Sequence, residues 1–405
     1  MNRIEIPMKS KTYKVLKILN VGHGDSIILR PEDGCTFMDE TILIDLGNGG
    51  TDITSSIGEE EKIHIFITHH DADHLGGLQF FFNKFSQVSE ITVPFYQNEI
   101  TLIAKAILNL KGIRSAVDCG EFIRALEDIV HHQFFIKKLT EDHDYHPKLS
   151  FAHDQIEYCC HIDCLNPPMI VDVYNWMREA SESDLIKISN EIFEPEFARD
   201  MEIYIRGMRR GEEYVDSWVI QNIMLYEQQD SNNNRDINQI KGSFVMDFFM
   251  RNIGSIRKFN ERPDRELLRK IYENYVKCTH DVCTVLKVKF GGKSFLLTGD
   301  ATKKVFRRLI KEGKDISAGY LKMPHHGSIK NIDESILQMI KPEVAIISHG
   351  NRRFGKSKES LPNQETLELL EREKTRILIT NDVKKDSLTV MYKEHHKDDE
   401  YVDIQ

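Results

Sequence analysis

Residues 62–77, KIHIFITHHDADHLGG, place a short apolar run directly before a segment crowded with polar side chains. The apolar run is typical of a buried β-strand. The segment that follows holds three histidines and two aspartates between His69 and His74. Imidazole nitrogens and carboxylate oxygens are ligands that suit zinc, manganese or iron. A chain with this feature is expected to build a metal site at the carboxyl end of a buried strand.

Other predicted strands also end in polar residues that are able to bind a metal. The apolar runs that begin at residues 41, 295, 319 and 343 lead, in that order, to Asp45, to Asp300, to the pair His325 and His326, and to His349. Layered α/β folds place their functional sites at the carboxyl ends of strands. We therefore expect these side chains to meet the segment 69–74 at one edge of the sheets.

The order of predicted elements divides the chain into three parts. Residues 1–168 and 279–405 are rich in strand patterns, and the second of these parts ends in a charged tail. Residues 169–278 lack such patterns and consist mainly of long amphipathic segments, which predict a mostly helical insertion. Within the first part, the segment 122–139, FIRALEDIVHHQFFIKKL, is predicted as a helix that continues into a strand.

Composition restricts the class of protein. The 405 residues are 40% hydrophobic, with a net charge of −10, which indicates a globular chain with a large core. Apolar runs fall short of the roughly 20 residues of a membrane span, and the first residues do not resemble a signal peptide. The seven scattered cysteines suggest reduced thiols. We therefore expect a cytoplasmic protein. Its acidity disfavours a general nucleic-acid coat, although local basic patches can still bind phosphate.

The spacing H-x-D-x-D-H indicates a particular chemistry. Alternate residues such as His69, Asp71 and Asp73 lie on one side of a loop, while His70 is expected to point away. Two ions about 3.5–4 Å apart would then each gain ligands, with an aspartate from a distant strand between them. Such ions generate a hydroxide near neutral pH and stabilise charge on an attacked phosphoryl or carbonyl group. Each motif alone has an ordinary explanation as a turn or a surface pair, so the prediction rests on their joint occurrence and order.

The segments THHDADHLGG, FLLTGDA, LKMPHHGS and AIISHGNRRFG together resemble the metallo-β-lactamase fold. More narrowly, they are similar to the hydrolase domain of ComEC-like DNA-uptake proteins, which share a VGxGD turn (here 21–25) and a strand that ends in IDxG (here 44–47). The resemblance covers about 12–168 and 279–390. It implies a four-layer αββα sandwich of the α/β (α+β) class, with the helical insertion between its two halves and the site at one edge of the sheets.

The resemblance assigns the ligands of one or two divalent ions, Zn²⁺ or Mn²⁺. His69 and Asp71 would bind one ion, and Asp73 and His74 the other. Asp300 would lie between the two ions.

The same resemblance assigns further roles around these ligands. His325 or His326 would complete the site or contact the substrate, so that these two and Asp73 are the candidate catalytic residues. Asp45 and Asp25 would support the ligands from behind, as outer carboxylates orient metal-bound histidines.

Three departures from the family pattern stand out. Asp71 occupies a position that is histidine in most of the superfamily, which favours the ComEC-like branch and a harder metal such as manganese. The histidine that usually precedes the bridging aspartate has no clear counterpart, and His280 and His161 are the two candidates. The usual Gly-His-Pro of the last strand loop is absent, and His349 is predicted as a replacement ligand.

The first functional hypothesis is a metal-dependent phosphodiesterase, specifically a nuclease with a nucleic acid as its substrate. Basic residues in 303–311 and 351–358 flank the proposed site, where they would hold phosphates. An equally good interpretation of 303–311 is a solvated helix face. The predicted substrate-binding residues are Ser328, Arg352, Arg353 and Lys356.

Two alternatives stay open at the level of sequence. The second hypothesis is a hydrolase of a small ester, lactone, thioester or cyclic nucleotide, because one fold hosts many reactions. The third is a degenerate, non-catalytic sensor or scaffold that binds a partner protein through residues 169–278. The missing histidine and the unusual insertion motivate the third hypothesis.

Overall fold

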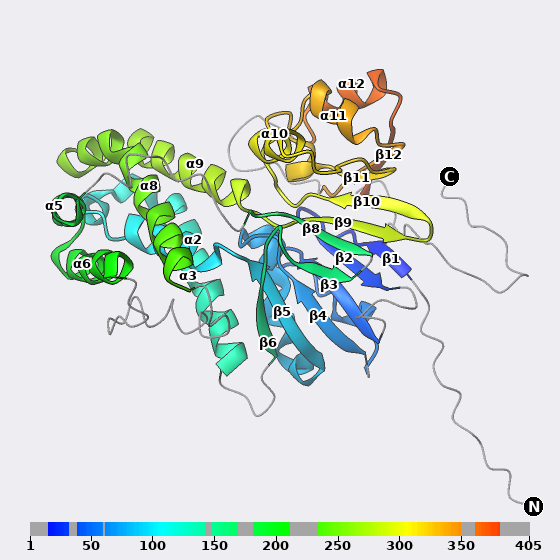
Figure 1. Cartoon of the computed structure of the whole chain (residues 1–405), viewed down its shortest axis with the longest axis horizontal. Helices are drawn as coiled ribbons and strands as arrows, with labels where there is room; N and C mark the ends of the chain where they lie inside the picture. Colours follow the sequence, from blue (N-terminus) through cyan, green and yellow to red (C-terminus); the bar gives the residue numbers. More distant parts are fainter. Residues whose placement is uncertain are drawn as a thin grey trace, which may run out of the picture.

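A computed structural model of the chain describes residues 15–31, 39–59, 61–141, 147–159, 161–168, 181–210, 234–349 and 361–380. Two β-sheets form its centre (Figure 1). The first contains β1 (Val15–Ile18), β2 (Ser26–Arg30), β3 (Glu40–Leu46), β4 (Lys62–Phe66), β5 (Val88–Pro94) and β6 (Lys148–Ala152). The second contains β7 (Glu157–Cys159), β8 (Ile162–Asn166), β9 (Val285–Phe290), β10 (Lys293–Leu297), β11 (Tyr320–Lys322), β12 (Val344–Ile347) and β13 (Arg376–Ile379).

The two sheets share one design. The first runs in the order β1-β2-β3-β4-β5-β6, and the second in the order β13-β12-β11-β10-β9-β8-β7. In each sheet one half is antiparallel and the other half is parallel, with the change of direction at β3 and at β10. A hairpin at Gly291 and Gly292 joins β9 to β10, and both glycines have the positive φ that such a tight turn requires. The parallel halves direct their carboxyl ends toward one edge of the sandwich.

The sheets pack face to face through an apolar core. Alternate residues of each strand point into it, as the two-residue period of a strand requires. From the first sheet come Ile42, Ile44 and Phe66, and from the second come Leu286 and Phe295, all of them buried. Burial of this layer holds the two halves of the chain together.

Helices cover both outer faces of the sandwich. On the first sheet lie α1 (Ala72–Leu75), the 3₁₀ segment η2 (Gly76–Gln87) and part of α3 (Gly120–Glu141). On the second sheet lie α10 (Lys303–Lys311), α11 (Glu334–Ile340) and α12 (Gln364–Arg372). The predicted four-layer αββα sandwich is therefore confirmed.

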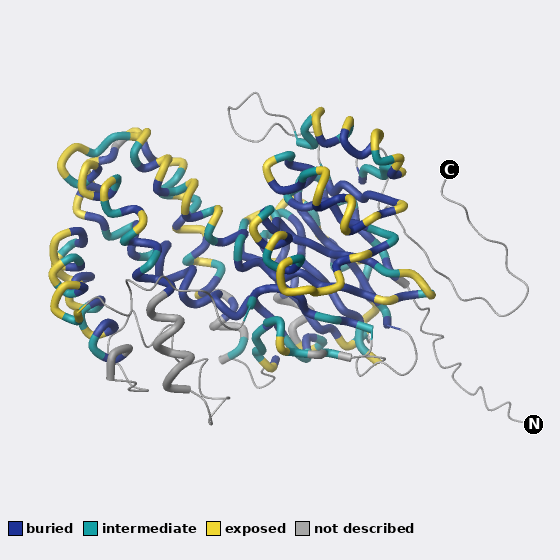
Figure 2. Tube along the Cα trace, turned by 45° about the horizontal axis from the view of Figure 1, so that its top comes forward, coloured by how far each residue is buried: buried dark blue, intermediate teal, exposed yellow. Residues whose placement is uncertain are grey.

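The described parts of the insertion, 181–210 and 234–281, are helical and share a core with the first half of the chain. They contain α5 (Glu182–Ile192), α6 (Pro195–Arg210), α8 (Asn234–Glu261) and α9 (Arg265–Asp281). These helices pack with α2 (Gln97–Ile107) and with α3 around buried side chains such as Phe193, Phe249 and Ile271. Figure 2 shows this second buried centre beside that of the sheets. The predicted boundary at residue 278 falls inside α9.

Two further expectations have clear outcomes. The segment 122–139 contains no strand, because all of it lies in α3. Its aromatic and branched residues suggested a strand, but Ile136 packs on the outer face of the first sheet from the helix itself, so tertiary packing overrides the local pattern. None of the helices that the structure describes combines the length and the apolar character that crossing a membrane requires.

Candidate metal centre

The candidate ligands gather at the ends of strands from both sheets and at the end of one helix. Asp45 closes β3, and the segment 68–74 leads from β4 into α1. Asp300 follows β10, and His325 and His326 follow β11 in the short η5 segment (Pro324–Gly327). The parallel strands bring these residues to one edge of the sandwich, as predicted from the sequence.

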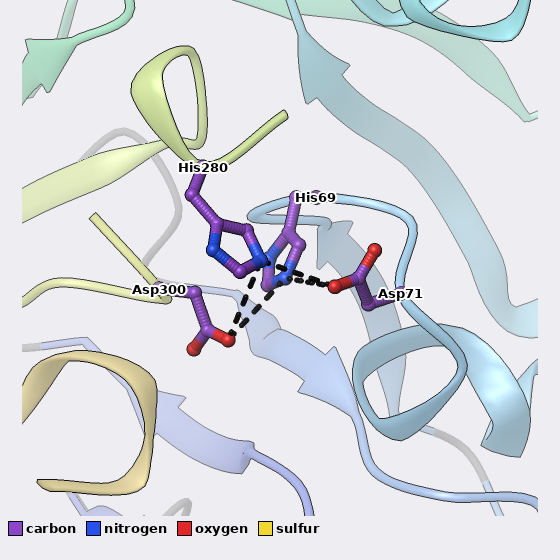
Figure 3. Close-up of side chains that lie close together, drawn as sticks. All are labelled: His69, Asp71, His280 and Asp300. Atoms are coloured by element: carbon purple, nitrogen blue, oxygen red, sulfur yellow. Dashed lines mark hydrogen bonds and ion pairs between the residues drawn. The ribbon is translucent and has the colours of Figure 1, made fainter. Parts of the chain in front are cut away.

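The first group of ligands consists of His69, Asp71, His280 and Asp300, whose ligand atoms all lie within 4.8 Å of one another (Figure 3). Nε2 of His280 lies 3.1 Å from Oδ2 of Asp71 and 3.7 Å from Oδ2 of Asp300. Nε2 of His69 lies 3.5 Å and 3.7 Å from the same two oxygens. The four side chains come from the β4 loop, the end of α9 and the β10 loop, and they point toward a common centre.

A second set of ligands adjoins the first and shares Asp300 with it. His74, Asp300 and His326 form one close group, and His23, Asp73 and His326 form another. Nε2 of His74 lies 3.4 Å from Oδ1 of Asp300. Oδ2 of Asp73 lies 3.0 Å from Nε2 of His326 and 3.5 Å from Nε2 of His23. We call Asp73, His74, Asp300 and His326 the second group, and His23 lies beside it.

Outer hydrogen bonds fix which nitrogen of each imidazole faces the centre. Nδ1 of His74 donates to Oδ2 of Asp45 at 2.7 Å, which directs Nε2 toward Asp300. Asp45 also accepts from Thr68, at 2.7 Å from its backbone N–H and at 2.6 Å from its hydroxyl. Nδ1 of His326 donates to the carbonyl of Ser348 at 2.8 Å. Such outer partners set the tautomer of a metal-binding histidine.

A buried lysine balances part of the negative charge. Lys322, 1% exposed, forms an ion pair with Asp25 and donates to the carbonyl of Gly299 at 3.0 Å. Burial acts to lower the pKa of Lys322, but Asp25 and Asp300 raise it above its usual value. Lys322 is therefore charged at neutral pH.

Several aspartates and histidines of the two groups stabilise one another's charged forms. Burial opposes the shift, yet Asp45 and Asp300 raise the pKa of His74 well above its usual range. The pKa of Asp71 falls well below its usual range, because His69 and His280 outweigh the effect of burial. Without ions, these mutual contacts satisfy charges that a divalent cation would otherwise neutralise.

Buried atoms without hydrogen-bond partners test whether the site suits a metal. Nε2 of His69, Nε2 of His74 and Oδ1 of Asp300 are buried and make no hydrogen bond. Buried polar atoms of this kind are rare and call for an explanation such as an ion. Their chemistry and their shared direction fit divalent metal ions, and the two groups supply nitrogen and oxygen donors.

The other predicted site residues lie as follows. His325 is the more open member of its pair, with 28% of its side chain exposed, and its Nε2 lies 3.7 Å from Oδ2 of Asp300. Ser328 is buried, and its hydroxyl accepts from the N–H of Lys330 at 3.3 Å. Asp25 lies behind His74, with 3.8 Å between Oδ2 and Nδ1. Arg352, Arg353 and Lys356 fall outside the described residues.

His280 lies within the first group of candidate ligands, whereas His349 lies in neither group. His349 follows β12, and its ring centre lies 6.1 Å from that of His23, so its predicted role as a replacement ligand stays a prediction. His161 precedes β8 and is also absent from both groups. His280 reaches the centre because α9 ends beside the β4 loop. His280 and Asp71 are 209 positions apart in the sequence, so their contact depends on how α9 packs in the folded chain.

Sequence reasoning also passed over His23 and Lys322. His23 was treated as part of a glycine turn, although a histidine between two glycines beside a strand end was an available signal. Lys322 stands in the apolar strand segment that leads to the two histidines, where a lone lysine is itself unusual. Both signals become informative only once the neighbouring carboxylates are located.

Comparisons with known proteins agree with this fold. Residues 9–153 match the family model described as the metallo-beta-lactamase superfamily. The chain therefore contains a metallo-beta-lactamase superfamily domain, whose buried His and Asp clusters are suited to divalent metal ions.

A particular relative shares part of this domain. The chain is 38% identical over 98 residues to ComE operon protein 3 of Bacillus subtilis (strain 168). The shared stretch covers 24% of this chain and only 12% of the relative. The similarity is thus distant and partial.

Proposed function

We propose that this protein is a metal-dependent hydrolase that cleaves phosphodiester bonds, with a nucleic acid as its substrate. One observation carries the proposal: two adjoining groups of buried ligands share Asp300. This arrangement matches the sites that hold two ions for in-line displacement at phosphorus. Divalent ions held there would supply an activated water and would neutralise charge on the attacked group.

The residues of the chain have distinct tasks in this proposal. His69, Asp71 and His280 would hold one ion, Asp73, His74 and His326 would hold the other, and Asp300 belongs to both groups. Asp45 and Lys322 contact these ligands or their neighbours and stay out of the centre. His325 is the more exposed histidine beside Asp300, and we assign it to contact with the substrate.

The donor set favours Zn²⁺ or Mn²⁺ among the common divalent ions. Both groups combine imidazole nitrogens with carboxylate oxygens, and neither contains a thiolate. A mixed nitrogen and oxygen set is compatible with zinc and with manganese. Asp71 adds an oxygen donor to the first group, which makes manganese our first choice for that ion.

The choice of substrate rests on sequence similarity more than on the described surface. The resemblance of the motifs to ComEC-like DNA-uptake proteins supports phosphodiester chemistry, and the partial match to ComE operon protein 3 supports that resemblance. Helix α10 adds little support, because three of its five basic residues, Lys304, Arg307 and Arg308, already have partners. Lys304 pairs with Asp281 at 2.9 Å, and Arg307 pairs with Asp333 at 2.9 Å. This pairing favours the second candidate, a hydrolase of a small ester, lactone, thioester or cyclic nucleotide.

The non-catalytic hypothesis loses its main ground. It was based on the absence of a histidine before the bridging aspartate. His280 lies 3.7 Å from Asp300 and fills that place in the first group. A ligand set of this kind is what a hydrolase of the fold needs.

A substrate panel tests the proposal. Purified protein is first analysed for bound metal and is then assayed with Mn²⁺ or Zn²⁺ on single-stranded DNA, duplex DNA, RNA and a generic phosphodiester. We expect cleavage that falls at least 100-fold in Asp73→Ala and His74→Ala, with folding intact by circular dichroism. Asp52→Ala, a change at an exposed turn residue, is the matched control.

The possible outcomes separate the two candidates. Binding to DNA that weakens steeply with added salt supports the nuclease. Hydrolysis of small esters or cyclic nucleotides alone supports the second candidate. Cleavage that persists undiminished in Asp73→Ala and His74→Ala would overturn both.

A further inference from the structure

His70 lies between two ligands of the first group and yet faces away from the metal centre. It is 1% exposed, and its ring contacts the helical part of the molecule. Nδ1 of His70 lies 2.8 Å from Oε1 of Gln97, at the start of α2. Nε2 of His70 lies 3.4 Å from the hydroxyl of Tyr275, in α9. A single imidazole thus joins the metal-binding loop to two helices.

Further hydrogen bonds extend this contact into the helical core, and each side chain donates to the next one. Because Oε1 of Gln97 can only accept, His70 carries its proton on Nδ1 and accepts from Tyr275 at Nε2. Nε2 of Gln97 then donates to Oε1 of Gln133 in α3 at 3.1 Å. Nε2 of Gln133 donates to Oδ1 of Asn98 at 3.1 Å. All five side chains are buried.

Helix α9 contacts the loop 69–71 at two points. Tyr275 bonds to His70, and five positions later His280 bonds to Asp71. Breaking the inner contact would leave a buried hydroxyl and a buried imidazole nitrogen without partners, which is costly in a low-dielectric core. The inner contact therefore opposes any shift of α9 relative to the loop.

We propose that Tyr275, His70 and Gln97 form a positioning chain through which the helical insertion sets the geometry of the first metal group. The inference rests on the proposed function, since it requires that ions bind there. The positioning chain is connected to His69, Asp71 and His280 through the polypeptide backbone. Its three side chains contact none of the second group. Its loss will weaken one ion selectively, whereas general damage to the fold would weaken both.

Stepwise titration of the metal-free protein with Mn²⁺ or Zn²⁺ tests this. His280→Ala identifies the binding step of the first group, and His326→Ala identifies that of the second. We expect Tyr275→Phe and Gln97→Met each to weaken the first step about tenfold or more, the size typical of outer partners of metal ligands. The second step should stay within twofold of the wild type. Tyr204→Phe, at another buried tyrosine of the helical core, is the matched control and should change neither step.

The outcomes distinguish this inference from the proposed function. If the wild type binds ions in two steps and Tyr275→Phe alters neither, the positioning chain is overturned and the metal site stands. An equal loss in both steps would also overturn it, because that is what a purely structural role predicts. If the wild type binds no divalent ion, the proposed function fails together with the inference.

Discussion

At the scale of single residues, the site is built on backbone conformations that side chains rarely adopt. Asp45, His325 and His326 have φ values of 58°, 46° and 52°, in the left-handed region. A backbone in this region costs on the order of 1–3 kcal/mol per residue and persists only where the surrounding structure holds it. Such conformations are common at functional sites. Here the turn after β11 brings His326 to Asp73, and the end of β3 brings the Asp45 carboxylate to His74.

Asp45→Asn tests how much the orientation of His74 matters. An amide has a single acceptor oxygen, so the side chain loses either the bond from the Thr68 N–H or both bonds from the Thr68 hydroxyl and His74 Nδ1. We expect the affinity of the second group for its ion to fall about 10- to 100-fold, measured by competition with a chelating dye. Asp52→Asn, a change at an exposed turn residue, should leave the affinity for the ion unchanged. Equal affinities in the two variants would contradict this role.

His64, in β4, predicts a pH dependence of stability away from the metal. Its Nε2 lies 2.7 Å from the Thr92 hydroxyl, and burial lowers its pKa to about 4, although Glu40 acts in the opposite direction. The unfolded chain binds a proton at its ordinary pKa of about 6.5. The contribution of the neutral imidazole is therefore complete above pH 6.5 and is lost progressively as the pH falls to about 4.

The corresponding measurement compares the wild type with His64→Leu. Between pH 6.5 and 4, we expect the free energy of unfolding of the wild type to fall more steeply with pH than that of the variant. The difference between the two slopes corresponds to at most one bound proton. Urea unfolding of the metal-free proteins at several pH values gives this slope. Parallel curves for the two proteins would show that His64 does not titrate differently on folding.

At the scale of elements, α9 has the largest functional role of the inserted helices. It begins at an aspartate cap and ends at the metal centre. Oδ1 of Asp264 accepts from the N–H groups of Glu266 and Leu267 at 2.9 and 3.1 Å. His280 lies in its last turn. The insertion therefore supplies a candidate ligand.

Asp264→Ala should separate the stability of α9 from its role at the metal. Loss of the cap is expected to lower the free energy of unfolding by about 1 kcal/mol, measured by urea denaturation. Because the cap lies at the opposite end of the helix from His280, metal affinity should not change. Asp264→Asn keeps an acceptor and should stay close to the wild type. A marked loss of metal affinity in Asp264→Ala would show that the whole helix moves.

At the scale of the whole molecule, the metal centre lies where separate cores meet. Helix α9 belongs to the core of the insertion, while β4 and β10 contribute to the core between the sheets. His280, His69 and Asp300 come from these different parts. An ion that binds all three therefore links the insertion to both halves of the sandwich.

Removal of metal should consequently lower global stability. A free ion at 100 times its dissociation constant adds about 2.7 kcal/mol for each site. We expect the melting temperature to fall on treatment with a chelator and to recover when Mn²⁺ or Zn²⁺ is added back, as measured by scanning calorimetry. His74→Ala should lose much of this response. Identical melting curves with and without chelator would contradict the coupling.

The sequence by itself determined the class of fold and predicted most of the candidate ligands. The order of the motifs and the polar strand ends predicted the convergence of His69, Asp71, Asp73, His74 and Asp300, and the resemblance of these motifs to the metallo-β-lactamase fold implied the sandwich. These features are local, because a strand and the loop that follows it carry their own pattern. The helical character of 169–278 was predicted for the same reason.

Tertiary structure alone decided which distant side chains complete the site. His280 joins the first group of candidate ligands because α9 packs against α2, α3 and α8, and nothing near His280 in sequence indicates that contact. Lys322 and Asp25 form an ion pair only because β11 ends beside the turn before β2. The strand expected in 122–139 gave way to helix for a related reason. Contacts between elements far apart in sequence depend on the packing of whole surfaces, which a local pattern does not specify.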